Sequence, residues 1–413
     1  MSPNMVVLAA LVFQLTACSS SFFGDGVEKP KVKGGDKDQG RDTALSENQS
    51  DPNSNIPSIG VGEFKEGEWH LTFKHLDLAQ VGLDEEAMNF GLAKAFNSVS
   101  QVSEVVQVPA LPGGLSYSVD PNKFGLTSQQ QSAVESCSFL KTTQVDGVDF
   151  WEADTFMYCI LEPRIYYQMM GISRAGNMER TTESKFAAQR TSSNHSMVAV
   201  VDSPVANGND RLMERIERPD GGVFWGTGDY LSPRGIASAK QAGTFPAGDQ
   251  RRSIQAFKAG EFMWEMDNGF IGFALSGFGA QPRYEANRRV ASDPGRDDGF
   301  VIAGYGCMGC HSTGFNAGEY TSDVGRGSQT ADYPSKDAFE ALIAKDNARY
   351  KSALMKLGYS EKTVDGPDPV TAIINNFESR TGTKFREGGA VGALGGGGGG
   401  FGGGFGGFGG FGN

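Results

Sequence analysis

Three residues that could carry chemistry lie together in the stretch GYGCMGCHSTGF, residues 304 to 315. They are Cys307, Cys310 and His311. The chain has only 5 cysteines and 4 histidines among 413 residues, so random placement would rarely bring three of them so close. A C-x-x-C-H cluster has three chemical uses: zinc binding, dithiol redox chemistry and covalent attachment of a porphyrin.

Zinc and dithiol chemistry both lack part of their usual pattern. A structural zinc site needs four ligands, but Cys137 and Cys159 form no second C-x-x-C and are not followed by a pair of spaced histidines. A thioredoxin-like dithiol lies between a strand and a helix of a βαβ unit, and the glycines of AGYGCMGCHSTGFNAG do not fit that context. A mixed zinc site stays open as an alternative.

Covalent haem attachment is the use that explains the histidine next to the second cysteine. Positions i and i+3 of a helical turn share a face, so Cys307 and Cys310 can both reach the vinyl groups along one porphyrin edge and form thioethers. His311 then offers an imidazole nitrogen as an axial ligand, and Gly309 has no side chain to crowd the porphyrin edge. The motif therefore predicts one covalent haem c, with His311 as the proximal iron ligand.

The motif resembles that of bacterial c-type cytochromes. The chain is also similar to a little-characterised group of exported monohaem proteins, in which a long N-terminal region precedes a single C-x-x-C-H. The similar segments are LAKAFNSVS (92–100), EPRIYYQMMGI (162–172), VFWGTGDY (223–230) and GEFMWEMDNGFIGFAL (260–275). The resemblance implies a haem protein that transfers electrons, and it implies little about any substrate.

An apolar run near the N-terminus, MVVLAALVFQLTACSS, is too short to span a bilayer. Its residues 15 to 18, LTAC, resemble the lipobox of bacterial lipoproteins, which implies cleavage before Cys18 and lipidation of its sulfur. Residues 1 to 4 lack the Lys or Arg of a usual signal peptide, so an ordinary apolar terminus with a buried cysteine is the alternative. We expect a lipid-anchored protein of the bacterial cell envelope, at the outer membrane and facing the periplasm or the surface.

Composition divides the chain into five regions. We expect a lipoprotein signal peptide (1–17), a disordered polar tether (18–62), an α+β domain with an antiparallel sheet (63–295), a small, mostly helical cytochrome c-like haem domain (296–387) and a disordered Gly/Phe-rich tail (388–413). The hydrophobic share of 38% is sufficient for a packed core in the two middle regions.

Local signals predict several helices and strands. Asp84 can cap a helix over EEAMNFGLAKAFNSV, Ser335 a helix over the apolar-periodic segment that follows it, and Asp368 a last helix. The segments LSYSVD and SMVAVVDSPV have the β-branched content of strands. Asn268 and Gly269 lie between two apolar runs and suit the positive φ angles of a tight turn, which predicts an antiparallel hairpin.

Cys137 and Cys159 remain after the other three cysteines are assigned. An exported protein folds under oxidising conditions, so we expect these two to form a disulfide that stabilises the fold by about 3 kcal/mol. Two buried, reduced cysteines are the alternative, because SCSFL and FMYCIL both have the composition of core segments.

The second axial position of the iron decides what the haem does. An electron carrier fills that position, whereas an enzyme or a gas sensor leaves it open. Met355 is the first candidate by its position after the motif. Met263, Met266 and His195 are weaker candidates, because strand packing or an ordinary surface or core position explains each of them without iron.

The net charge of −12, without any cluster of Lys and Arg, argues against a nucleic-acid partner. The long region before the motif contains no nucleotide-binding fingerprint, nucleophile elbow or H-E-x-x-H sequence. We therefore expect a membrane-tethered monohaem c-type cytochrome that passes single electrons to a redox protein partner, rather than an enzyme. The alternatives are a haem enzyme or sensor with an open iron site, such as a peroxidase, and a binding or adhesion lipoprotein with an accessory haem.

Overall fold

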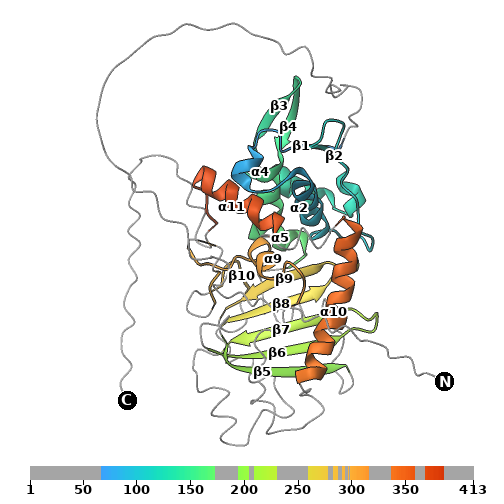
Figure 1. Ribbon diagram of the computed structural model, residues 1–413, viewed down its shortest axis with the longest axis vertical. Helices are drawn as coiled ribbons and strands as arrows, with labels where there is room; N and C mark the ends of the chain where they lie inside the picture. Colours follow the sequence, from blue (N-terminus) through green and yellow to red (C-terminus); the bar gives the residue numbers. More distant parts are fainter. Residues whose placement is uncertain are drawn as a thin grey trace, which may run out of the picture.

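The computed structural model describes part of the chain, in two packed regions (Figure 1). The described residues are 67–172, 194–203, 209–229, 259–277, 282–286, 291–293, 296, 298–315, 336–358 and 368–385. The expected signal peptide, Cys18 and the whole tether, Ser335 and the Gly/Phe-rich tail lie outside these residues.

A four-stranded mixed sheet and several helices form the N-terminal region, at the top of Figure 1. Its strand order is β2-β1-β4-β3, in which β1 and β4 are parallel and the two outer pairs are antiparallel. The strands are β1 (Trp69–Thr72), β2 (Ser116–Val119), β3 (Thr142–Val145) and β4 (Val148–Glu152). The helices are α1 (Leu78–Val81), α2 (Glu85–Asn97), the 3-10 helix η1 (Pro121–Phe124), α3 (Ser128–Glu135), α4 (Ala153–Leu161) and α5 (Pro163–Met169).

A six-stranded antiparallel sheet forms the second region, with the strand order β10-β9-β8-β7-β6-β5. Its strands are β5 (His195–Ser203), β6 (Asn209–Glu217), β7 (Val223–Asp229), β8 (Ala259–Glu265), β9 (Ile271–Ser276) and β10 (Pro282–Arg283). The C-terminal helices are α9 (Tyr305–Cys310), α10 (Lys336–Lys356) and α11 (Pro369–Thr381). In Figure 1, α10 runs along the large sheet from β5 toward α2, and α9 and α11 lie closer to the N-terminal region.

The predicted helix starts and strands are confirmed where the structure describes them. The Asp84 carboxylate accepts a hydrogen bond from the Ala87 amide at 2.8 Å, and the Asp368 carboxylate accepts one from the Thr371 amide at 3.1 Å. Both caps satisfy an amide that the first helical turn leaves without an intrahelical partner. LSYSVD contains β2 and SMVAVVDSPV contains most of β5, as predicted.

Helix α10 packs along the large sheet through a buried polar cluster at Asp346. The Arg215 guanidinium of β6 donates to both Asp346 oxygens at 2.7 and 2.8 Å, and the Trp225 indole of β7 donates at 2.9 Å. The side chains of Arg215 and Asp346 are almost fully buried, so the pair needs these additional hydrogen bonds to offset its desolvation.

The predicted hairpin is confirmed, but its turn is longer than predicted. Strands β8 and β9 pair antiparallel, and the Met266 amide donates to the Phe270 carbonyl at 2.8 Å, which closes a three-residue loop. Within this loop the Gly269 amide donates to the Met266 carbonyl at 2.9 Å. Gly269 takes a φ of +84°, whereas Asn268 does not take a positive φ. The Asn268 side chain instead accepts from the Phe270 amide at 3.0 Å and donates to the Asn97 carbonyl at 2.9 Å. This link to the end of α2 explains why Asn268 is not a positive-φ turn residue.

The mixed α/β class with antiparallel pairing is confirmed, but a separate cytochrome c-like helical domain is not shown. Helix α11 packs against α2 and α4, and the buried side chains from Trp69 to Phe385 form one hydrophobic core. A Cβ on Gly91 of α2 would lie 2.9 Å from Ile373, so glycine permits the close crossing of α2 and α11. The predicted boundary at residue 296 stays a prediction of the sequence, since α9 and α11 bury their apolar faces on the N-terminal region.

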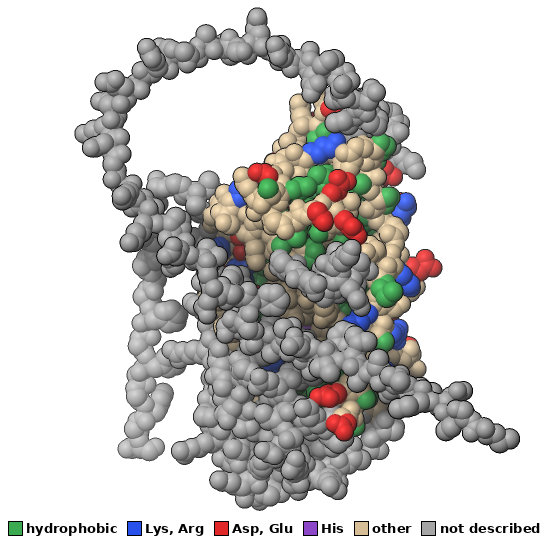
Figure 2. Space-filling model, viewed as in Figure 1, with side chains coloured by type: hydrophobic (Ala, Val, Ile, Leu, Met, Phe, Trp, Pro, Cys, Tyr) green, Lys and Arg blue, Asp and Glu red, His purple; other side chains and the backbone are tan. Residues whose placement is uncertain are grey.

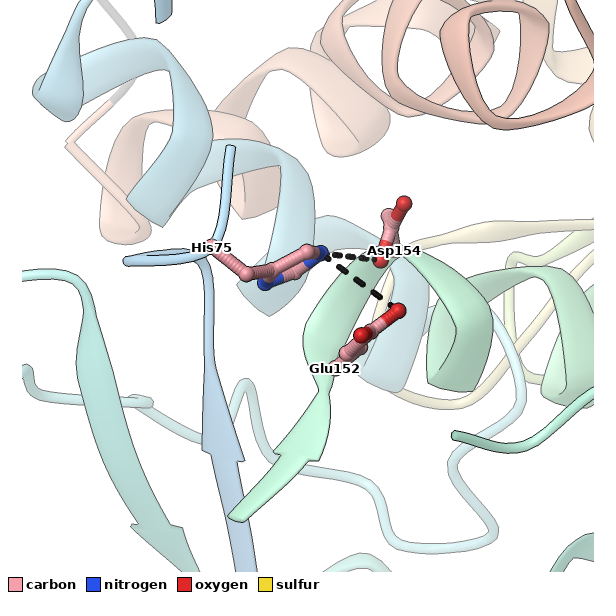
Figure 3. Close-up of side chains that lie close together, drawn as sticks. All are labelled: His75, Glu152 and Asp154. Atoms are coloured by element: carbon pink, nitrogen blue, oxygen red, sulfur yellow. Dashed lines mark hydrogen bonds and ion pairs between the residues drawn. The ribbon is translucent and has the colours of Figure 1, made fainter. Parts of the chain in front are cut away.

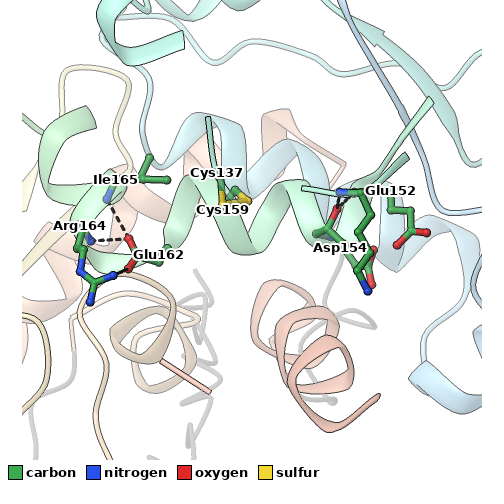
Figure 4. Close-up of a disulfide and its surroundings, with 9 residues drawn as sticks. Cys137, Glu152, Asp154, Cys159, Glu162, Arg164 and Ile165 are labelled. Atoms are coloured by element: carbon green, nitrogen blue, oxygen red, sulfur yellow. Dashed lines mark hydrogen bonds and ion pairs between the residues drawn. A yellow bond between two sulfur atoms is a disulfide. The ribbon is translucent and has the colours of Figure 1, made fainter. Parts of the chain in front are cut away.

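The predicted disulfide between Cys137 and Cys159 is present (Figure 4). It joins the last turn of α4 to the segment after α3. The first turn of α4 carries Asp154 at one end, and Glu162 caps the following helix at the other. The bond therefore fixes the helix whose start lies at the end of β4.

Acidic and basic side chains are interspersed on the described part of the face shown in Figure 2. Among the described residues, none of the helices combines the length and the hydropathy that a membrane span requires. The surface in view therefore has a mixed charge pattern on a chain whose net charge is −12.

Candidate functional site

Helix α9 carries both cysteines of the C-x-x-C-H motif, and His311 is its C-terminal cap. The His311 amide donates to the Cys307 carbonyl at 2.9 Å, which continues the helical hydrogen bonding through the motif. Cys307 and Cys310 are therefore one turn apart on the same side of a helix, as the haem prediction requires, and neither is in a disulfide. Cys307 and His311 are buried and Cys310 is half-buried.

The imidazole of His311 has a defined orientation. Its Nδ1 lies 3.1 Å from the Gly314 carbonyl oxygen, and its Nε2 points toward Glu261 of β8, with 3.5 Å between Nε2 and Oε1. A carbonyl can only accept, so Nδ1 carries a proton and donates it to Gly314, which leaves Nε2 to face the sheet. Nε2 is thus the nitrogen that could bind a metal.

Helix α10 fixes the loop that supplies this carbonyl. The Asn347 side chain accepts from the Phe315 amide at 2.7 Å and donates to the Phe315 carbonyl at 2.9 Å. Gly314 itself has a φ of +126°, and a side chain there would collide with Asn347. The hydrogen bond of His311 Nδ1 to the Gly314 carbonyl therefore depends on a glycine and on a helix that follows the motif by more than twenty residues.

The large sheet forms the wall that faces His311. The Phe273 ring of β9 lies 5.7 Å from the imidazole, centroid to centroid, beside Glu261 of β8. On the neighbouring strands, Arg211 and Asp229 form an ion pair of 2.6 Å that is largely buried. The wall therefore combines an aromatic ring with buried charged groups.

Two groups in this site have shifted pKa values. Burial raises the pKa of the Cys307 thiol, and the nearby Glu261 carboxylate raises it further, so the thiol stays protonated. Burial also acts to raise the pKa of Glu261, but the His311 imidazole and the Arg211 guanidinium outweigh it and the pKa is lowered. Glu261 is therefore a carboxylate held by its basic neighbours.

The structure separates the four predicted candidates for the second axial ligand. Met355 is 67% exposed on α10, and an axial ligand must be buried against the iron, so the structure argues against Met355. His195 lies on β5, an edge strand that β6 and β7 separate from β8. Met266 is buried at the turn after β8.

Met263 is a predicted candidate on the face of the large sheet that contacts His311. It is buried on β8, two residues after Glu261, and pairs directly with Phe273 of β9. Side chains at positions i and i+2 of a strand share a face, and so do directly paired residues. Met263 therefore faces the same side as Glu261 and Phe273.

Gly309, which the sequence predicts to leave the porphyrin edge uncrowded, lies in the structure against α11. A Cβ at this position would lie 3.0 Å from the Thr371 Oγ1 of α11. The missing side chain thus permits α9 to pack against α11, and the predicted role at the porphyrin edge stays a prediction.

The donor set fits haem c in residue type, in order along the helix and in the orientation of the imidazole. The Glu261 side chain lies in front of Nε2, so it must turn aside for an iron porphyrin to bind there. A preformed zinc site at the motif is not found in the described part of the chain. A group of three potential metal ligands does lie elsewhere in the described residues, in the N-terminal region. It consists of His75, Glu152 and Asp154, whose ligand atoms all lie within 4.8 Å of one another.

Sequence reasoning did not identify Glu261, Phe273 or Arg211 as part of the site. Each is an ordinary strand residue in the sequence, and the contact of β8 with α9 joins segments about fifty residues apart. No local pattern marks such a contact, because it depends on how the sheet and the helix pack.

Comparison of the chain with protein-family models, with curated proteins and with solved structures finds no match in any of the three. The functional assignment therefore rests on the motif and on the geometry of the site.

Proposed function

We propose that this protein is a monohaem c-type cytochrome, tethered to the bacterial cell envelope, that carries single electrons. One observation carries the proposal. A helix presents Cys307 and Cys310 on one side, and in His311, its C-terminal cap, Nδ1 is bonded to a carbonyl while Nε2 points toward the large sheet. Thioether bonds to the two cysteines and coordination by Nε2 account for all three residues of the motif. The haem, when bound, supplies a one-electron couple at the iron.

A buried polar network holds α9 in place. The Tyr305 hydroxyl donates to Glu378 of α11 at 2.8 Å, and the Arg296 guanidinium donates to both residues at 2.9 and 2.7 Å. Each member of the network has a hydrogen-bond partner, so the arrangement is rigid rather than costly. A rigid attachment helix suits electron transfer, in which the protein should rearrange little between the two oxidation states.

Met263 is the residue that best supports the electron-carrier role. It lies on the sheet face that is turned toward His311, the same face as Glu261 and Phe273. A thioether sulfur is a soft ligand suited to a low-spin haem iron. With haem bound and the Glu261 side chain turned aside, Met263 would be the residue that supplies a second ligand to the iron.

A haem enzyme or sensor is the second candidate function, and Glu261 is the observation that favours it. A buried carboxylate close to Arg211 faces Nε2 of His311 across the site. Such a carboxylate could accept a proton near an open iron, a step that an electron carrier does not need. The two functions differ in whether Met263 or Glu261 lies against the iron.

The membrane tether is part of the proposal and is supported by the sequence. Lipidation at Cys18 and the polar segment that follows would hold the folded region near the outer membrane, on its periplasmic or surface side. Replacement of Cys18 by serine should move the protein from the membrane fraction to the soluble envelope fraction.

Extraction with acid and organic solvent tests the haem proposal, because it removes non-covalent haem and leaves covalent haem on the polypeptide. We expect the haem absorption to stay with the wild-type protein and to disappear in the C307A/C310A variant. The reduced spectrum and a redox titration then separate the two functions. A low-spin spectrum with a one-electron transition indicates a carrier, whereas a high-spin ferric spectrum with rapid ligand binding indicates an open site.

A further inference from the structure

A second cluster of potential metal ligands lies in the N-terminal region, where two parallel strands end side by side. Strand β1 pairs with β4 in parallel, with Thr72 opposite Glu152. His75 follows β1 by three residues, Glu152 is the last residue of β4, and Asp154 lies in the first turn of α4. The carboxyl ends of neighbouring parallel strands bring these three side chains to one place, which is a common position for binding sites.

The three side chains point toward one another (Figure 3). His75 Nε2 lies 2.8 Å from Asp154 Oδ1 and 3.8 Å from Glu152 Oε2, and the three atoms all lie within 4.8 Å of one another. The Thr155 amide donates to Asp154 Oδ1 at 2.8 Å and fixes that carboxylate in place. The cluster is therefore positioned by the backbone of two strands and a helix.

Burial leaves two polar atoms of this cluster without a hydrogen bond. The His75 side chain is 10% exposed, points into the cluster with Nε2, and has no hydrogen-bond partner at Nδ1. Glu152 Oε2, which faces His75, is buried and also has no hydrogen-bond partner. A buried carboxylate oxygen without a donor is costly, and a cation between the three side chains would satisfy it.

We propose that His75, Glu152 and Asp154 bind a divalent transition-metal ion of the Zn²⁺ type. One imidazole nitrogen and two carboxylate oxygens form a ligand set that suits Zn²⁺ better than Mg²⁺, which prefers oxygen ligands alone. Ligand atoms about 2.0–2.2 Å from a tetrahedral Zn²⁺ lie about 3.3 Å from one another. The 2.8 and 3.8 Å separations at His75 lie on either side of that value, so small side-chain movements complete the site. The ion replaces the proton that His75 and Asp154 share.

Arg380 of α11 competes with the ion. Its guanidinium forms an ion pair with Asp154 Oδ2, and its side chain is 37% exposed. The guanidinium neutralises one carboxylate and repels a second cation, but it can move into solvent because it is partly exposed. Removal of Arg380 should therefore strengthen metal binding, an effect that damage to the fold would not produce.

Calorimetric titration of Zn²⁺ into the metal-stripped full-length protein tests the proposal. We expect one Zn²⁺ per chain for wild type, and binding weaker by at least about tenfold in H75Q and E152Q, since even second-shell changes cost about 10- to 100-fold. We expect tighter binding in R380A. Mg²⁺ should not compete at equal concentration.

The matched control is H70Q, which removes an imidazole from β1 outside the cluster and should bind Zn²⁺ like wild type. Cys307, Cys310 and His311 are unchanged in all variants, so the result does not depend on whether haem is attached. Equal binding by H75Q and H70Q would overturn the proposal, as would weaker binding in R380A than in wild type. If H75Q does not fold, E152Q and R380A decide the result in the same way.

Discussion

Met263 and Met355 differ at the residue scale in burial and in position, and the difference predicts opposite outcomes for their replacement. The helical period that buries Leu354 of α10 turns the next residue, Met355, toward solvent. Met263 is buried on the sheet face that is turned toward His311. We expect M263A to change the visible spectrum of the reduced protein and to lower its midpoint potential, because the iron loses a thioether ligand.

M355A is the matched control for this prediction. It removes an exposed methionine from α10, so its spectrum and potential should equal those of wild type and its stability should change by less than about 0.5 kcal/mol. Identical spectra of M263A and wild type, together with an altered spectrum of E261Q, would favour the haem enzyme over the electron carrier.

The phase of a helix could thus be predicted from sequence, but the partner of a side chain could not. The apolar period after Ser335 predicted a helix, which the structure confirms as α10, and Phe339, Ile343 and Leu354 lie on its buried side. That Glu261 faces His311 depends on the packing of β8 against α9, and no residue near Glu261 in the sequence signals it.

At the element scale, Glu265 links the end of β8 to α10. Its side chain is 2% exposed and lies 2.6 Å from the Arg349 guanidinium, and burial nevertheless raises its pKa from 4.5 to about 7. Because the pKa is higher in the folded than in the unfolded state, the contribution of Glu265 to the free energy of unfolding is fully present below pH 4.5. This contribution is lost as the pH rises through about 7.

We therefore expect E265Q to gain stability relative to wild type as the pH rises from about 4.5 to 7, by on the order of 3 kcal/mol. Urea unfolding of both proteins at pH 4.5, 6 and 8 measures the difference. Parallel pH profiles for the two proteins would show that Glu265 is ionised in the folded state throughout.

The disulfide makes a second prediction for an element, because it fixes α4 to the segment after α3. Cys137 and Cys159 are 22 residues apart, and closing a loop of this length stabilises by about 3 kcal/mol in the chain-entropy model. The C137A/C159A variant should lose about this free energy of unfolding in guanidinium titrations. An unchanged midpoint would mean that the unfolded chain is already restricted in this region.

Elements with local signals were the predictable part of the fold. Asp84 and Asp368 cap their helices through amides three residues away, so the sequence contains the whole interaction. The hairpin was predicted with the wrong turn, because the Asn268 side chain bonds to Asn97, which is far away in the sequence. Sheet order and the parallel pairing of β1 with β4 had no local signal at all.

At the scale of the whole molecule, a buried ion pair joins the start of α11 to α2. The Lys94 ammonium donates to the Asp368 carboxylate, and both side chains are at most 2% exposed. Loss of one partner of such a pair leaves a buried charge and costs about 3–5 kcal/mol. We expect D368N to lose about this stability, even though asparagine caps a helix as well as aspartate does.

The control is D84N at the start of α2, where the same substitution changes a cap and should cost little.

Thermal unfolding followed by far-UV circular dichroism and by the haem band should show one coincident transition in wild type, because α9 and α11 share the core of the N-terminal region. Two separate transitions would instead support an independent haem domain from residue 296.

The sequence predicted a division into residues 63–295 and 296–387 from composition and from the resemblance of the motif to that of c-type cytochromes. The core shows why composition could not decide this: α9 is short and buries Tyr305 and Cys307 only against other elements. A short apolar helix has the same sequence whether it packs within its own domain or against another one.

Mass spectrometry of the peptide that contains Cys307, Cys310 and His311 tests the central claim most directly. In protein purified from a cell envelope in which cytochromes c mature, the account predicts this peptide with the added mass of one haem and with neither thiol available for alkylation. The same peptide recovered with both cysteines alkylated and no added mass would contradict it.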